Sequence, residues 1–196
     1  NNEDGDGLVL KIYTLNHDIT VTELFPVLKN MGMNIISERK YHFTSKALQY
    51  NIVTLTLEKQ NSKLKLKATR ASAMLESLID ILAGSYQDDR LNALILETDI
   101  SKDQLSIMRA YVDYTLQICP AIQKSFMLAT IGKYPGLVYE LINIFSARFD
   151  PTRPNTNDGL LQLHDSFIAN LDMVSTNNEE RFFRLLLACI FATMRT

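Results

Sequence analysis

Residues with the chemical types needed for catalysis are few in this sequence and widely separated. His164, Asp165 and Ser166 are the residue types of a hydrolase relay, but neighbouring side chains on a helix project about 100° apart and cannot act in series. The other two histidines, His17 and His42, lie in a different part of the chain, so the three do not have the spacing of a metal site. We therefore expect no catalytic residue and no metal-binding residue here.

A cradle for a dinucleotide cofactor is also missing from the sequence. Such a cradle needs a glycine-rich turn that follows a strand and opens a helix. The seven glycines are scattered, and Gly5-Asp6-Gly7 precedes a predicted strand instead of following one. The sequence therefore predicts no cofactor-binding residue and no cofactor within this chain.

Composition excludes several classes of partner. The 196 residues are 46% hydrophobic and 21% charged, as in an ordinary soluble globular protein. A net charge of −2 gives no basic face for nucleic acid, and no apolar run approaches the roughly 20 residues of a membrane helix. Cys119 and Cys189 lack metal-site spacing and fit reduced, buried thiols in a cytoplasmic protein.

The first third of the chain has the pattern of a small sheet with one helix. Apolar and alternating segments predict strands at 8–13, 33–43 and 51–57. A helix capped by Thr20 or Thr22 lies between the first two strands, and Gly32 is placed to end it in a left-handed conformation. Strand, helix, strand, strand is half of a ferredoxin-like unit.

The rest of the chain has helical periodicity. Met74, Leu75, Leu78, Ile79 and Leu82 form one apolar stripe that Gly84 should end, and the period continues to the last residues. Ser101 is a plausible helix cap, and proline breaks follow Cys119 and Tyr134. The fold class is therefore α+β, with a β-α-β-β unit followed by a mostly helical domain.

The residues Gly32-Met33-Asn34-Ile35, after the first helix, resemble the same junction in ACT domains, which are small regulatory folds that often bind amino acids. This resemblance implies an ACT-like unit, with an amino-acid effector expected near the first strand-to-helix turn, at Asn16, His17 and Asp18. A simpler interpretation is that such a turn needs polar residues that tolerate bent backbone.

Longer runs resemble the large, multidomain NAD-specific glutamate dehydrogenases of bacteria. They occur in the same order and at about the same spacing as in that family. These runs are 24–41, 88–96, Arg109-Ala110-Tyr111, Lys133-Tyr134-Pro135, 145–151, 171–174 and 192–196. Because seven separate runs agree, the resemblance covers nearly the whole chain.

This resemblance implies that the full protein oxidises L-glutamate with NAD to 2-oxoglutarate and ammonia, and that the catalytic residues and the NAD site lie outside this chain. The chain starts at Asn1 and stops at Arg195-Thr196 inside an apolar helical pattern, so we expect it to be a fragment that is inactive by itself. Its expected partners are the catalytic domain of the same protein and further copies in a homo-oligomer. The alternative is a stand-alone helical interaction module.

The last predicted helix carries more apolar residues than one buried face needs. The last helix is apolar at almost every position, so we expect Phe183, Leu187 or Phe191 to remain uncovered and to meet the catalytic domain.

The expected divisions of the chain are a disordered segment or linker at 1–7, an ACT-like α+β domain at 8–66, a helical domain at 67–150, a hinge loop at 151–158, and C-terminal helices at 159–196.

Overall fold

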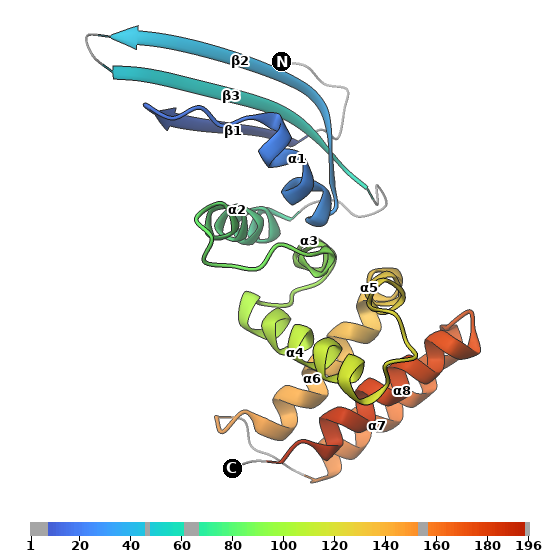
Figure 1. Ribbon diagram of the computed structural model, residues 1–196. Coiled ribbons are helices and arrows are strands. Elements are labelled where there is room, and N and C mark those ends of the chain that lie inside the picture. The colour runs from blue at the N-terminus through green and yellow to red at the C-terminus, as the bar shows by residue number, and fades with distance from the viewer. Residues whose placement is uncertain (1–7, 46–47, 61–66, 153–156, 195–196) are drawn as a thin grey trace. The chain divides into compact units, whose positions relative to one another are not determined.

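The computed structural model describes residues 8–45, 48–60, 67–152 and 157–194 (Figure 1). Contacts between Cα atoms divide the chain into two compact units, residues 1–96 and 97–196. The first holds all the described strands and the second is helical, which confirms the α+β fold class. The Lys- and Leu-rich segment 61–66 and the N-terminal segment 1–7 lie outside the described residues.

The first unit is built on a three-stranded antiparallel sheet. Its strands are β1 (Leu8–Leu15), β2 (Met33–Ser45) and β3 (Leu48–Lys59), in the order β1-β3-β2. Helix α1 (Val21–Asn30) connects β1 to β2. This is the predicted β-α-β-β arrangement, with β3 pairing on both sides.

One face of the sheet carries the core of the unit. Leu10 on β1 lies opposite Leu55 on β3, and both are buried with Val53 and Leu57. The alternation on β3 is strict because successive strand residues point to opposite faces. Leu24, Val27 and Leu28 of α1 are buried in the same cluster.

Helix α1 begins as its sequence predicts. The Thr20 hydroxyl accepts a hydrogen bond from the amide of Glu23, and the Glu23 carboxylate accepts one from the amide of Thr20. This reciprocal pair satisfies two amides that the helix itself leaves unpaired. Of the two candidate caps, Thr20 is therefore the one used.

The boundary between the units differs from the expected division near residue 66. Helix α2 (Ala68–Leu82) buries Met74 and Leu78 in the core of the sheet, together with Leu96 from the short helix α3 (Leu94–Glu97). The sheet has one apolar face and needs more cover than α1 alone provides. The change of periodicity therefore marks the start of helical structure, while the structural unit continues to Leu96.

The predicted stripe on α2 is only partly buried. Leu75, Ile79 and Leu82 keep 42%, 65% and 42% of their surface exposed, whereas Met74 and Leu78 are buried. Positions 74 and 78 are one helical turn apart and share a face, which is narrower than the apolar pattern suggested. The apolar stripe is therefore buried only along the face that carries Met74 and Leu78.

Gly32 and Gly84 follow α1 and α2 with φ of +78° and +73°, as the sequence predicted. A Cβ at position 32 would lie 3.3 Å from the Cβ of Ala93, whereas a Cβ at position 84 would meet nothing within 4 Å.

Replacing either glycine by alanine should cost about 1–2 kcal/mol, because alanine disfavours left-handed backbone. Only Gly32→Ala adds a steric clash to this cost. We expect Gly32→Ala to lower the free energy of unfolding in urea by more than Gly84→Ala. Equal losses would contradict the close approach of Ala93.

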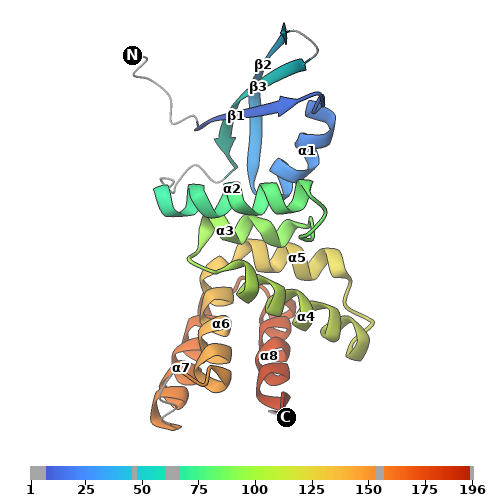
Figure 2. The ribbon, with the colours of Figure 1, turned by 90° about the vertical axis from the view of Figure 1, so that its left-hand side faces the viewer.

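The second unit is a set of packed helices. Helix α6 packs against α7, and α4 packs against both α5 and α8 (Figure 2). Helix α4 starts at a capping box in which the Ser101 hydroxyl accepts from the amide of Gln104. The helices are α4 (Lys102–Ile118), α5 (Lys124–Lys133), α6 (Pro135–Phe149), α7 (Asn157–Asn170) and α8 (Asn177–Ala192).

Two expectations about the last helix were wrong. Helix α8 does not run on to Thr196, because Thr193 has extended backbone and ends it. Phe183 and Leu187 are 0% and 6% exposed, so the helices of their own unit cover them, while Phe191 is half-buried. The opposite side of α8, with Arg181, Arg184 and Ala188, is exposed, so the helix buries one broad apolar face.

Of the expected hinge loop at 151–158, residues 153–156 lie outside the described residues. Pro151 and Thr152 form a turn, while 157 and 158 already belong to α7. The Asp150 carboxylate accepts hydrogen bonds from the amide and the hydroxyl of Thr152, at 2.9 and 2.6 Å. The described part of this loop is therefore a closed local turn.

Candidate functional site

The turn after β1, where an effector was expected, is occupied by internal bonds. Asn16 has φ of +54°, and its side-chain oxygen accepts from the amide of Gln49 at 2.9 Å. The buried Asn51 side chain donates to the carbonyl of His17 at 2.7 Å. Asp18 pairs with Lys40 at 2.6 Å, and this hydrogen bond lowers the pKa of the Asp18 carboxyl. These contacts fix the turn on the sheet.

The three histidines do not come together with acidic or thiol groups as metal ligands. Among the described residues, no cluster of three or more His, Cys, Asp or Glu side chains is placed to bind a metal ion. His42 lies 2.6 Å from the amide oxygen of Asn51, and His164 contacts its neighbour Asp165 at 3.0 Å. Each contact is local to its own unit.

Residues from the runs that carry the family resemblance meet at the C-terminal end of α8. The Tyr111 hydroxyl lies 2.7 Å from the hydroxyl of Thr193, and Arg148 donates to the Thr193 carbonyl at 3.2 Å. The Arg148 guanidinium also lies over the ring of Phe191. These contacts fasten the end of α8 to α4 and α6.

A second polar cluster fastens the beginning of α8. The Glu179 carboxylate accepts hydrogen bonds from Lys133 at 2.9 Å and from the Tyr134 hydroxyl at 3.2 Å. It also accepts one from the hydroxyl of Thr176, the N-cap of the helix. The hydrogen bond from Lys133 is the main cause of a lowered pKa at Glu179. Glu179 thus joins the α5–α6 junction to α8.

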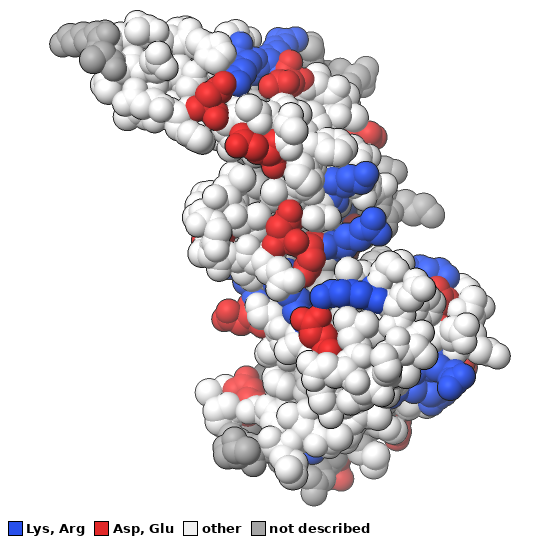
Figure 3. All heavy atoms as spheres, in the orientation of Figure 1, with Lys and Arg blue, Asp and Glu red and all other residues white. Residues whose placement is uncertain are grey.

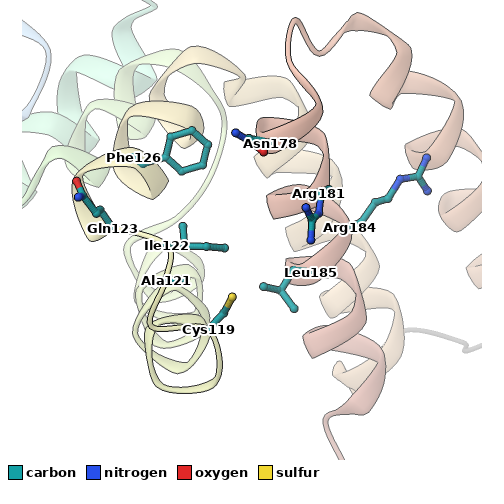
Figure 4. A pocket seen from close by; sticks show the side chains of 9 residues that line it. All are labelled: Cys119, Ala121, Ile122, Gln123, Phe126, Asn178, Arg181, Arg184 and Leu185. Atoms are coloured by element: carbon teal, nitrogen blue, oxygen red, sulfur yellow. The ribbon is translucent and has the colours of Figure 1, made fainter.

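The helical unit has a groove between the α4–α5 turn and α8 (Figure 4). Its volume of about 890 Å³ is within the range of small-molecule sites, roughly 300–1,000 Å³. Pro120 ends α4, because the residue before a proline is disfavoured in helical backbone. The chain then turns and forms one wall of the groove. The groove is lined by Cys119, Ala121, Ile122, Gln123, Phe126, Asn178, Arg181, Arg184 and Leu185.

The two arginines of the groove are placed differently. Arg184 binds Glu180 through two nitrogens, each 2.8 Å from Oε1, and its side chain extends away from the α4–α5 wall in Figure 4. Arg181 is exposed on the side of α8 that faces this wall, and no described carboxylate pairs with it. The groove therefore holds one unneutralised guanidinium beside apolar walls.

The two cysteines differ in environment. Cys189 is buried, and this burial raises the pKa of its thiol. Cys119, at the end of α4, is only partly buried and lies in the wall of the groove. The expectation of two buried thiols therefore holds only for Cys189.

Sequence reasoning did not anticipate the groove. Its two walls are separated by more of the chain than any local pattern spans, and no periodicity signals that they meet. The one available signal was that Arg181 and Arg184 interrupt an otherwise apolar run.

Elsewhere on the surface, acidic and basic side chains are interspersed on the face shown in Figure 3. None of the helices within the described ranges has the length and apolarity that a membrane span requires.

The fold defines a class: an ACT-like unit followed by a helical segment. Comparison with known families agrees. The glutamate dehydrogenase ACT3 domain matches residues 1–71, and glutamate dehydrogenase helical motif 3 matches residues 86–151. The chain belongs to the family of large NAD-specific glutamate dehydrogenases.

Individual relatives support the same assignment. The chain is 29% identical over 196 residues to the NAD-specific glutamate dehydrogenase of Halomonas elongata, covering 99% of this chain and 12% of that protein. The enzymes of the same name from Pseudomonas aeruginosa and Mycobacterium tuberculosis are 24% and 23% identical, over 95% and 90% of this chain. The chain spans 12% and 11% of those two relatives.

Proposed function

We propose that this chain is a noncatalytic, regulatory and structural segment of an NAD-dependent glutamate dehydrogenase. In its full-length form that enzyme would oxidatively deaminate L-glutamate to 2-oxoglutarate and ammonia, with NAD as the oxidant. The observation that carries the proposal is the pair of matches, because an ACT3 domain and a helical motif of the same enzyme family occur in one chain.

The contacts within each unit fit such a role. Asn51, Lys40 and the β1–α1 turn form a closed network, and Glu179 and Thr193 fasten both ends of α8. Polar groups held in this way are satisfied by protein partners and rigidify the fold. A rigid platform of this kind supports the assembly of a larger enzyme, and the proposal assigns the catalytic residues and the NAD site to other parts of the full protein.

Activity of the separate pieces tests the proposal. The 196-residue chain should give no NADH from glutamate and NAD, and titration calorimetry should show no NAD binding at micromolar concentrations. The full-length protein should form NADH from glutamate and release ammonia. Micromolar NAD binding by the chain would contradict its noncatalytic role, whereas a full-length protein that leaves glutamate unchanged would contradict the enzyme assignment.

A further inference from the structure

The charges in the lining of the groove between the α4–α5 turn and α8 favour a negatively charged ligand. None of its nine lining residues is Asp or Glu. Nearby cations are neutralised, since Lys124 lies 2.7 Å from Asp113 and Arg184 lies 2.8 Å from Glu180. Arg181 alone among the arginines of the lining has no carboxylate partner in the described part of the chain. A guanidinium recognises a carboxylate through two parallel hydrogen bonds.

The rest of the lining is suited to an uncharged, apolar body. Ile122 and Phe126 form one wall and Leu185 belongs to the other, so an apolar group between them is shielded from water on both sides. An ammonium group would find no acidic side chain in this lining.

We propose that this groove binds a small carboxylate with an apolar body, the carboxylate on Arg181 and the body between Phe126, Ile122 and Leu185. The site is separate from the β1–α1 turn, where ACT-type effectors are expected, and it does not depend on the dehydrogenase assignment. It would give the helical unit a ligand site of its own. The ligand is an acid without a compensating positive charge.

The test uses the 196-residue chain and the probe 3-phenylpropanoate, with the alcohol 3-phenylpropan-1-ol as its uncharged analogue. Calorimetry gives the Kd, and the rate of Cys119 alkylation by iodoacetamide, followed by peptide mass spectrometry, reports occupancy of the groove. The buried Cys189 is the internal reference thiol. We expect 3-phenylpropanoate to slow alkylation of Cys119 and the alcohol to bind more weakly by about tenfold, as for loss of a charge-assisted hydrogen bond.

Two matched variants on α8 test whether Arg181 binds the carboxylate. Arg181→Gln should raise the Kd of 3-phenylpropanoate by about tenfold or more, whereas Arg184→Gln should change it by less than about twofold, since its guanidinium is directed away and already paired. Both arginines are exposed, and thermal melts should show that both variants remain folded. Equal Kd values for Arg181→Gln and the parent chain would overturn the proposal. So would equally tight binding of the alcohol, or alkylation of Cys119 that the probe does not slow.

Discussion

Replacing Phe183 by alanine is expected to lower the free energy of unfolding by about 3–5 kcal/mol, the usual range for truncating a buried phenylalanine. Phe183 is 0% exposed, and its ring lies 5.7 Å from that of Phe182, 5.8 Å from that of Tyr134 and 6.5 Å from that of Phe167. Alanine would leave a cavity where three other rings meet. Urea unfolding followed by far-ultraviolet circular dichroism measures the loss.

The matched control for this variant is Phe191→Ala on the same helix. Phe191 is half-buried and contacts the ring of His164 edge-on, with centroids 5.6 Å apart. Its truncation should cost roughly 1 kcal/mol, because it removes less apolar surface from contact with protein. A loss below that value for Phe183→Ala would mean that the ring is not in the core, and the surface interface first expected for α8 would then regain support.

The second large effect is expected at Glu179. Alanine at this position removes the acceptor shared by Lys133, Tyr134 and Thr176, and should cost about 2–3 kcal/mol, as for loss of hydrogen bonds to a charged group. Glu180→Ala is the control, since its pair with Arg184 lies on the surface of the helix. Exposed pairs of this kind contribute less than about 1 kcal/mol. Similar losses in the two variants would contradict the role given to Glu179.

The Glu179 contribution should also depend on pH. The folded pKa of Glu179 is lowered from 4.5 by its hydrogen bond with Lys133, so its stabilisation is present above pH 4.5 and is lost as the pH falls through the folded pKa. The folded pKa of Lys133 is raised from 10.5, so its contribution is present below that pH and is lost as the pH rises through the folded value. The difference in stability between the parent chain and Glu179→Ala should therefore be largest between these limits. A difference that stays constant into acid would show that the carboxylate charge is not involved.

Local sequence patterns determined most of the secondary structure. The alternation on β3, the Thr20 and Ser101 caps and the left-handed Gly32 and Gly84 all act over a few residues, so they are visible without knowledge of the fold. The order of the motifs also carried the family resemblance, which depends on sequence alone.

Tertiary structure decided which apolar faces are covered. From sequence, Phe183 and Leu187 of α8 looked like surplus apolar surface, because one stripe was assumed to be enough for burial. In the fold, the other helices of its unit cover these residues, while Ile79 on α2 remains 65% exposed. Periodicity shows that a face is apolar, but only the packing of neighbouring helices shows how many faces are covered.

The candidate groove belongs wholly to tertiary structure. Phe126 and Arg181 face one another only because the α4–α5 turn lies beside the first half of α8. Likewise, the difference between Arg181 and Arg184 is the presence of Glu180 one turn before Arg184 and the direction in which each side chain extends. The sequence determined the elements and the family, and the packing of helices distant in sequence determined the site, because a site joins residues that no local periodicity relates.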